Sequence, residues 1–289
     1  MKVIRAEAMG FCFGVRDAID VARSIEKPDE VTIHGELVHN PVVLNELRGR
    51  GFQDAPEEKR DVPDTELVLI TAHGVSDKER NRLEGAGKKL IDTTCPLVSR
   101  VHRAAQTFDR QGYLVIVIGR PGHVEVRGII EDMTDYVVVP DVESVRFYAV
   151  THIGIVCQTT MPPDLVEEVR AEISSKNPDT EIRFVNTVCQ PTLDRQAAVD
   201  RLANLVDIVV VVGGNNSNNT RQLVRRVQAA GTRAIHIESA RELTEYRFWG
   251  VSAVGLTAGT STPDSVINEV YSTLSSMKER SDAVELQTA

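Results

Sequence analysis

The sequence predicts an α/β protein, a trefoil-like, pseudo-threefold arrangement of three small parallel-sheet units. Short runs rich in Val and Ile alternate with helical patterns along the chain, and this alternation is typical of parallel sheets built from βαβ crossovers. The second observation is a threefold repeat: an apolar strand ends in a cysteine, a helical stretch follows, and a second strand ends in a glycine. The three pairs, separated by 23, 24 and 24 residues, are Cys12 with Gly35, Cys95 with Gly119, and Cys189 with Gly213.

The spacing of the repeat sets the expected domain limits. The cysteines are 83 and 94 residues apart, which is too long for a solenoid repeat and close to the size of a small α/β domain. We therefore expect a first α/β unit over residues 13–95, a second over 96–188 and a third over 189–275. Residues 276–289 are polar and without periodicity, which is typical of a frayed tail.

The N-terminal segment, residues 1–12, is expected to complete the third unit. In the other two copies of the repeat, the strand before the cysteine adds to the sheet of the preceding unit. A cyclic arrangement then requires the strand before Cys12 to pair with strands from about 207–256, at the other end of the chain. The same arrangement would bring the three cysteine loops together at the pseudo-threefold axis.

The individual strands are short, continuous and apolar, as in sheets covered on both faces. They are expected at about 3–7, 31–34, 67–70, 88–91, 113–118, 136–139, 152–156, 181–185, 207–212, 234–237 and 252–256. The clearest helical patterns cover 96–110, 163–175, 192–205 and 219–230. Pro41, Pro96 and Pro163 fall at or near the first turn of a helix, where a missing N–H costs little. The charged stretch 55–64 is interpreted as a surface loop.

Composition excludes several classes of partner. The net charge is −9, and no block rich in Lys or Arg occurs, so binding to nucleic acid or to an anionic membrane through a basic field is not expected. The N-terminus has no signal-type apolar segment, and the longest apolar runs, such as 208–212, are too short to span a bilayer. We therefore expect a cytoplasmic protein. In a reducing compartment, its four cysteines are better candidates for metal ligands, nucleophiles or core residues than for disulfides.

The repeated cysteines are the main candidates for a cofactor site. A single cysteine after a strand is more often a small buried apolar residue than a ligand, but the threefold repeat favours a shared role. Three thiolates that meet on one axis suit either an iron–sulfur cluster or a zinc ion completed by histidine. A cluster on three cysteines leaves one iron free to bind substrate. Cys157 has no counterpart in the repeat and is interpreted as a core residue.

Two loops between a buried strand and a helix are candidate anion sites. In segments 212–220 and 258–263, backbone N–H groups and hydroxyls at the start of a helix would face an incoming phosphate. The alternative is that Ser or Asn in these loops simply caps the helix. Neither segment contains lysine, which argues against a Walker-type nucleotide site.

Histidines end three strands of the first two units. His39, His73 and His123 could donate hydrogen bonds to a diphosphate or bind a metal, although a single histidine in such a loop is usually just hydrogen-bonded. Glu125 is the carboxylate closest in sequence to one of them. Its alternative role is that of an acid in the first turn of a helix, where the helix dipole favours negative charge.

Several motifs together resemble one family, the LytB-type 4-hydroxy-3-methylbut-2-enyl diphosphate reductases. The resemblance covers nearly the whole chain up to the tail. The motifs are Gly10-Phe11-Cys12-Phe13-Gly14-Val15, Val38-His39-Asn40, Ala72-His73-Gly74-Val75, Asp92-Thr93-Thr94-Cys95-Pro96-Leu97-Val98, Gly122-His123-Val124-Glu125, Gln158-Thr159-Thr160 and Ser261-Thr262-Pro263-Asp264.

The resemblance implies a trefoil fold around an oxygen-sensitive [4Fe–4S] cluster held by Cys12, Cys95 and Cys189. It implies removal of the allylic hydroxyl of the diphosphate substrate with two electrons and two protons, giving isopentenyl and dimethylallyl diphosphate, the last step of the methylerythritol phosphate route. The cluster would act as Lewis acid and electron source, supplied by a donor such as ferredoxin or flavodoxin. Glu125 and Thr159 would handle protons. The residues implied to hold the diphosphate are His39, His73, His123, Thr159, Ser217, Asn218, Asn219 and Ser261.

The chain departs from the family pattern at two positions. Val124 replaces the usual proline after His123, and Asn218 replaces the usual serine after Ser217. Two other classes of function are considered beside the reductase. A zinc hydrolase with three cysteines and one histidine would contain no iron and show no visible absorption, and a non-enzymatic iron–sulfur sensor would show no turnover.

Overall fold

The computed structural model describes residues 1–55 and 61–287, with side chains described as far as residue 277. It divides into two compact units. We call Met1–Cys12, His39–Pro41 and Gln190–Ala289 the terminal unit, and Phe13–Val38 with Val42–Cys189 the central unit. The charged loop expected over 55–64 lies partly outside the described residues.

The described helices and strands alternate along the chain, as expected. The strands are β1 (Lys2–Arg5), β2 (Val31–His34), β3 (Gln53–Ala55), β4 (Leu67–Ile70), β5 (Lys89–Asp92), β6 (Leu114–Ile118), β7 (Tyr136–Val139), β8 (His152–Cys157), β9 (Glu181–Phe184), β10 (Ile208–Val212), β11 (Arg233–Ile237) and β12 (Ala253–Ala258). The helices are α1 (Phe13–Ser24), α2 (Pro41–Arg50), α3 (Asp77–Gly85), α4 (Pro96–Arg110), α5 (Val124–Ile130), α6 (Pro163–Lys176), α7 (Gln190–Ala203), α8 (Asn218–Ala229) and α9 (Asp264–Gln287), with short 3₁₀ turns η1 (Pro28–Glu30), η2 (Val142–Ser144) and η3 (Ala240–Glu245).

The described strands form three four-stranded sheets of the same internal order. Sheet A has the order β1-β12-β10-β11, sheet B has β3-β2-β4-β5, and sheet C has β7-β6-β8-β9. Every neighbouring pair is parallel. In each sheet the first strand after a cysteine helix lies in the centre, and the strand before the next cysteine lies at one edge. The expected α/β fold of three parallel-sheet units is confirmed.

The N-terminal strand pairs with the C-terminal third of the chain. β1 lies parallel to β12, with Lys2 opposite Ala253 and Arg5 opposite Leu256. The amide of Lys2 donates to the carbonyl of Ser252 at 2.8 Å. The pairing expected from the cyclic repeat is therefore confirmed.

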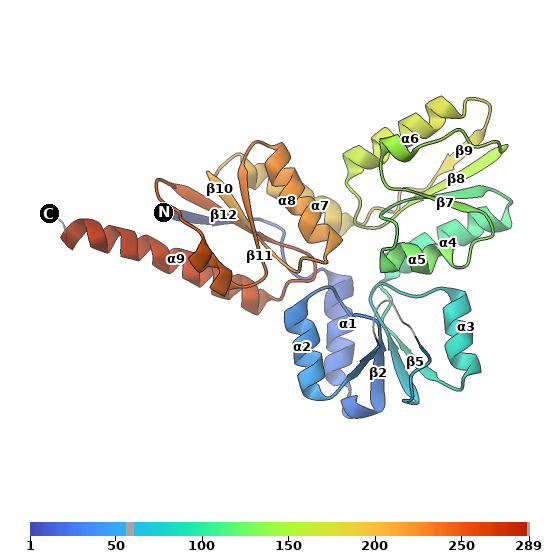
Figure 1. Ribbon diagram of the computed structural model, residues 1–289, viewed down its shortest axis with the longest axis horizontal. Helices are drawn as coiled ribbons and strands as arrows, with labels where there is room; N and C mark the ends of the chain where they lie inside the picture. Colours follow the sequence, from blue (N-terminus) through green and yellow to red (C-terminus); the bar gives the residue numbers. More distant parts are fainter. Residues whose placement is uncertain (56–60, 288–289) are drawn as a thin grey trace. The chain divides into compact units, whose positions relative to one another are not determined.

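Sheet A is covered on both faces. Val210, Leu256 and their neighbours on one face of the sheet pack with α9 and η3, including Val270 and Leu243. Alternate residues such as Val211 point to the other face and pack with α7 and α8. Because both faces of β10 are buried, its five residues are continuously apolar. Figure 1 shows α7 and α8 on one side of this sheet and α9 on the other.

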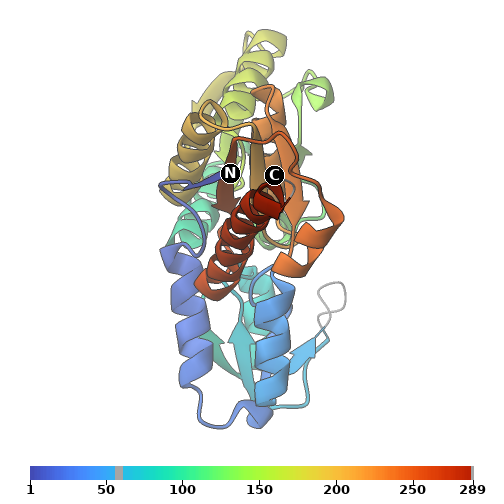
Figure 2. The same cartoon turned by 90° about the vertical axis from the view of Figure 1, so that its left-hand side faces the viewer.

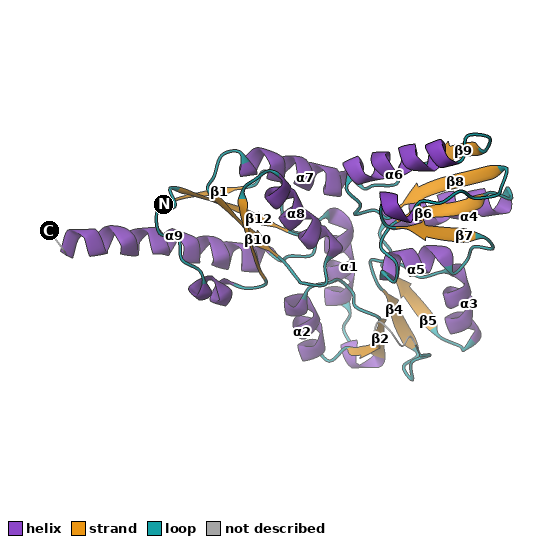
Figure 3. Ribbon diagram, turned by 45° about the horizontal axis from the view of Figure 1, so that its top comes forward, coloured by secondary structure: helices purple, strands orange, loops and turns teal. Residues whose placement is uncertain are grey.

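The central unit contains sheets B and C. In sheet C, Val115, Val117 and Val156 pack with α4 and α5, while α6 covers the other face, as Figure 3 shows. Gly154 of β8 leaves room for the ring of Phe108 in α4, since a Cβ there would lie 2.3 Å from that ring. In sheet B, α3 packs on one face through Leu83, and Figure 2 shows α1 and α2 side by side along the other.

Two sequence-based expectations need correction. Strand β3 was not expected, because Gln53–Ala55 is a polar edge strand with mostly exposed residues and so lacks the apolar pattern. The frayed tail expected from residue 276 is instead helical up to Gln287, since α9 continues through it. Within the described residues, no helix is both long and apolar enough to cross a membrane.

Candidate active site

Most of the expected site residues lie in loops or first helical turns at the carboxyl ends of the central strands. In each sheet the strand order reverses between two central strands, β2 and β4, β6 and β8, or β10 and β12, and such a reversal is where parallel sheets bind ligands. The residues that follow these strands are His39, His73, His123, Glu125, Thr159, Ser217, Asn218, Asn219 and Ser261. Cys12, Cys95 and Cys189 instead follow the edge strands β1, β5 and β9.

Each of the three cysteines makes the same kind of backbone hydrogen bond. The amide of Cys95 donates to the carbonyl of Ala72 at 3.1 Å, and the amide of Cys189 donates to that of Thr159 at 2.9 Å. In the terminal unit, the amide of Cys12 donates to Thr260 at 3.2 Å. Each acceptor lies in the loop after the neighbouring strand. The threefold sequence repeat is therefore accompanied by the same local hydrogen bond at each cysteine.

Glu125 and Thr159 form a buried pair in the central unit. Glu125 is only 2% exposed and Thr159 only 5%. The amide of Thr159 donates to Oε1 of Glu125 at 2.6 Å, and its hydroxyl donates to Oε2 at 2.9 Å. Both carboxylate oxygens are therefore held in place. Because the Thr159 carbonyl accepts the Cys189 amide, one residue links the candidate acid to a candidate cluster ligand.

His123 and His73 lie together beside this pair. His123 caps α5, and its Nδ1 accepts from the amide of Glu125 at 3.1 Å, so the neutral ring carries its proton on Nε2. The ring of His73, from the loop after β4, stands edge-on to it with centroids 6.0 Å apart. His123 therefore caps helix α5, and Glu125 lies in its first turn, as the alternative structural interpretation of Glu125 expected. This arrangement orients the same groups that the resemblance assigns to substrate and protons.

Gly14 makes close contact with Cys95. A Cβ on Gly14 would lie 2.4 Å from the Cys95 Sγ, so a side chain at this position would collide with the thiol. Gly14 is not among the site residues predicted from the sequence, although it belongs to the motif around Cys12. Its signal in the sequence is its place two residues after Cys12.

Gly14→Ala is expected to displace Cys95 and to lower the iron and sulfide content of the anaerobically reconstituted protein. Overpacking of this kind costs about 1–3 kcal/mol. Gly49→Ala is the matched control, because Gly49 also lies in a helix and a Cβ there would meet nothing within 4 Å. Equal iron content in the two variants would show that the space beside Cys95 is not required.

The terminal unit holds a second group of buried polar side chains. Ser217 caps α8 by accepting the Thr220 amide at 3.3 Å, and Ser261 donates to the His39 carbonyl at 3.1 Å. The Oδ1 of Asn219 accepts the amide of Thr260 at 3.0 Å. Its Nδ2 is buried and has no acceptor among the described residues. An unsatisfied buried N–H is costly, and an anionic ligand at the start of α8 would satisfy it.

The sequence profile of the LytB protein family matches residues 3–275. The chain belongs to the LytB protein family. It is 35% identical to the 4-hydroxy-3-methylbut-2-enyl diphosphate reductase of Aquifex aeolicus, with 96% of this chain and 98% of the relative covered. The enzyme of the same name from Methylibium petroleiphilum is 37% identical, with 94% and 84% covered.

Solved structures of LytB-type reductases have the same fold. The E-1-hydroxy-2-methyl-but-2-enyl-4-diphosphate reductase of Plasmodium falciparum superposes with a TM-score of 0.86 at 28% identity, with 94% of this chain and 87% of that chain covered. A reductase described as the terminal enzyme of the non-mevalonate pathway gives 0.67 at 35% identity, with 96% and 100% covered. This LytB chain is therefore an enzyme of the reductase class.

The donor set of this LytB chain suits an iron–sulfur cluster. Cys12, Cys95 and Cys189 form no disulfide and are of intermediate exposure, and the backbone amide of each donates to the loop after the neighbouring strand. Cys157 is fully buried in β8, and burial raises the pKa of its thiol to about 12, which confirms it as a core residue. In the described part of the chain, no group of three or more His, Cys, Asp or Glu side chains is placed to hold a metal ion. The meeting of the three cysteines thus stays a prediction.

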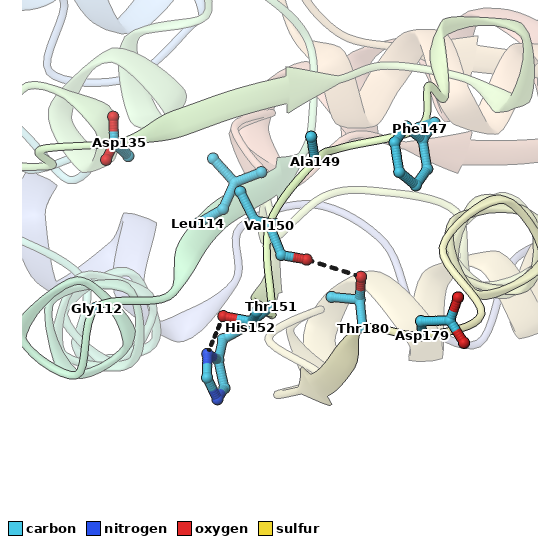
Figure 4. Close-up of a pocket in the computed structure, with 10 residues that line it drawn as sticks. All are labelled: Gly112, Leu114, Asp135, Phe147, Ala149, Val150, Thr151, His152, Asp179 and Thr180. Atoms are coloured by element: carbon cyan, nitrogen blue, oxygen red, sulfur yellow. Dashed lines mark hydrogen bonds between the residues drawn. The ribbon is translucent and has the colours of Figure 1, made fainter.

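A separate pocket of about 700 Å³ lies at the amino ends of the sheet C strands. Figure 4 shows its lining, in which the Thr180 hydroxyl donates to the Val150 carbonyl and Thr151 pairs with His152. Phe147 on its rim is exposed. None of the expected site residues lines this pocket. The pocket lies at the amino ends of the sheet C strands, whereas Glu125 and Thr159 lie at their carboxyl ends. We therefore do not assign it to the active site.

Proposed function

We propose that this LytB-family reductase removes the allylic hydroxyl of 4-hydroxy-3-methylbut-2-enyl diphosphate. The C–O bond breaks, two electrons and two protons are consumed, and water leaves with formation of isopentenyl or dimethylallyl diphosphate. This would be the last step of the methylerythritol phosphate route. The observation that carries the proposal is the similarity, along almost the whole chain, to reductases that bear this substrate's name.

Cys12, Cys95 and Cys189 would hold a [4Fe–4S] cluster. When bound, such a cluster supplies electrons and a Lewis-acidic iron with an open position. The equivalent amide contacts of the three cysteines support an equivalent role. A cytoplasmic donor such as ferredoxin or flavodoxin would deliver the electrons.

The diphosphate would be bound by neutral donors rather than by cations. Ser217, Asn218, Asn219 and Ser261 are all buried polar side chains at the carboxyl end of sheet A, and the N-terminus of α8 adds backbone N–H groups and a favourable dipole. Imidazole donors of His39, His73 and His123, together with Thr159, complete the proposed set. Hydrogen bonds of this kind to an anion are stronger than those between neutral groups.

Glu125 would supply a proton to the departing oxygen. An allylic hydroxyl is a very poor leaving group unless its oxygen is protonated, so a positioned acid is needed. At the carboxyl end of the sheet C strands, Thr159 holds the carboxyl group of Glu125 through both Oε1 and Oε2. The Thr159 hydroxyl, which has no acidity of its own near neutral pH, would orient or relay the proton at Oε2.

An anaerobic assay tests this function. The protein reconstituted with iron and sulfide is expected to consume the allylic diphosphate when a reduced dye supplies electrons, and mass spectrometry should detect both isomeric diphosphates. Metal analysis should find iron rather than zinc. A protein that carries the cluster and takes electrons but forms neither product would contradict the proposal and favour a sensor role. A colourless zinc protein with hydrolytic activity would favour the hydrolase.

A further inference from the structure

Arg195 is an unusual buried cation in the terminal unit. Among the described side chains, it is the only Lys or Arg that is buried, with 6% exposed. It lies in the second turn of α7. Burial of a guanidinium is costly unless all its donors find acceptors. The position of those acceptors therefore indicates what the residue does.

The Arg195 guanidinium joins the carbonyl of Gly10, 185 positions away in the sequence, to a carbonyl in the first turn of its own helix α7. Its Nε and one terminal nitrogen donate to the carbonyl of Gly10 at 3.2 and 2.6 Å. The other terminal nitrogen donates to the carbonyl of Pro191 at 2.9 Å. A planar, five-donor fork is needed to reach both acceptors at once, and a lysine ammonium cannot reproduce this geometry.

Both carbonyls belong to cysteine segments. Gly10 precedes Cys12 by two residues, and Pro191 follows Cys189 by two residues. Gly10 adopts a left-handed conformation, with φ of 73°, and a Cβ there would lie 2.8 Å from the Ile267 side chain. On its other side, the turn is held by the Gly10 amide on Ala258 and the Cys12 amide on Thr260. Arg195 therefore adds a third hydrogen-bonded contact to the turn before Cys12, through the Gly10 carbonyl.

We propose that Arg195 is a positioning residue for the iron–sulfur ligands, in that it fixes the turn before Cys12 to the start of the helix after Cys189. The assignment rests on the proposed function, since it presumes that these cysteines hold a cluster. Arg195 itself touches neither substrate nor cluster in this role. Its effect is to keep the Cys12 segment in one conformation, so that the thiol does not have to be ordered when the cluster binds.

The test compares Arg195→Met and Arg195→Lys with Arg201→Met. Arg201 is the matched control, because it lies on the same helix and forms an ion pair with Glu7 of the N-terminal segment, but both side chains are exposed. Each protein is reconstituted anaerobically, and the loss of iron and of visible absorption is followed after addition of a chelator. Circular dichroism during heating reports separately on folding.

We expect Arg195→Met to fold and to lose its cluster at least about tenfold faster than the wild type. Tenfold corresponds to roughly 1.4 kcal/mol, near the lower end for hydrogen bonds to charged groups. Arg195→Lys keeps the charge but not the fork, and should recover only part of the retention. Arg201→Met should behave like the wild type.

Three results would overturn the assignment. The first is wild-type cluster retention in Arg195→Met, and the second is an equal loss in Arg201→Met. The third is failure of both Arg195 variants to fold, which would make the residue part of the general core. If the wild-type chain itself takes up no iron and sulfide, the proposed function fails and the assignment fails with it. Retention in the wild type and in both variants would remove only the role of Arg195.

Discussion

Serine in place of Cys12, Cys95 or Cys189 is expected to abolish stable cluster binding and with it all reductase turnover. A serine hydroxyl is a hard and weakly acidic donor, whereas iron–sulfur clusters are held by thiolates. The three cysteines make the same amide contact with the neighbouring loop, so we expect three similar losses. Iron and sulfide, measured per chain after anaerobic purification, check this directly.

Cys157→Ser is the control for this series. Cys157 is fully buried in β8, so its replacement should reduce thermal stability while the cluster remains. Full retention of iron in any of the three ligand variants would refute the ligand set. So would a loss of cluster that occurs in Cys157→Ser alone.

Glu125→Gln is expected to keep the cluster and bind substrate but to lower turnover at least about a hundredfold, because loss of a positioned acid typically costs roughly 10²–10⁴ in rate. Glutamine can still accept one hydrogen bond from Thr159, so the local fold should survive. It cannot supply the proton. The measurement is kcat under anaerobic conditions, with iron content determined on the same sample.

His39→Ala separates binding from chemistry. Loss of a contact to the diphosphate should mainly raise KM, whereas loss of the acid should mainly lower kcat. Near wild-type turnover in Glu125→Gln, with its cluster intact, would mean that the proton comes from another group. Glu125 would then serve only as the first-turn carboxylate of α5, held by Thr159.

Much of the fold could be predicted because local sequence patterns indicate it. Buried strands such as β10 are continuous apolar runs, and Pro96 marks the first turn of α4. β3 was not predicted, because Gln53–Ala55 is a polar edge strand. Its pairing with β2 depends on sheet geometry rather than on its own residues. The helical conformation of the end of α9 was not predicted because polar composition alone does not distinguish a helix from coil.

The candidate site was only partly predictable for the same reason. Motifs placed Glu125 and Thr159 at the ends of strands, but nothing local shows that the hydroxyl of one donates to the carboxylate of the other across 34 positions. The contact between Arg195 and Gly10 joins residues 185 positions apart. In the sequence, Arg195 is simply a charged residue in a helix. Such long-range polar contacts follow from the tertiary fold and leave no periodic signal.

The pairing of β1 with β12 has a consequence for the order in which the protein can be assembled during synthesis. Lys2 and its partner Ala253 are 251 positions apart, so β1 is synthesised long before β12 and has no partner strand until β12 has emerged from the ribosome. Sheets B and C contain no such delay, because all their strands come from contiguous stretches. Closing so long a loop is slow relative to local pairing. The segment that carries Cys12 therefore cannot complete its pairing before β12 has been synthesised. A nascent chain that lacks its C-terminal third lacks both β12 and the Thr260 carbonyl that accepts the Cys12 amide.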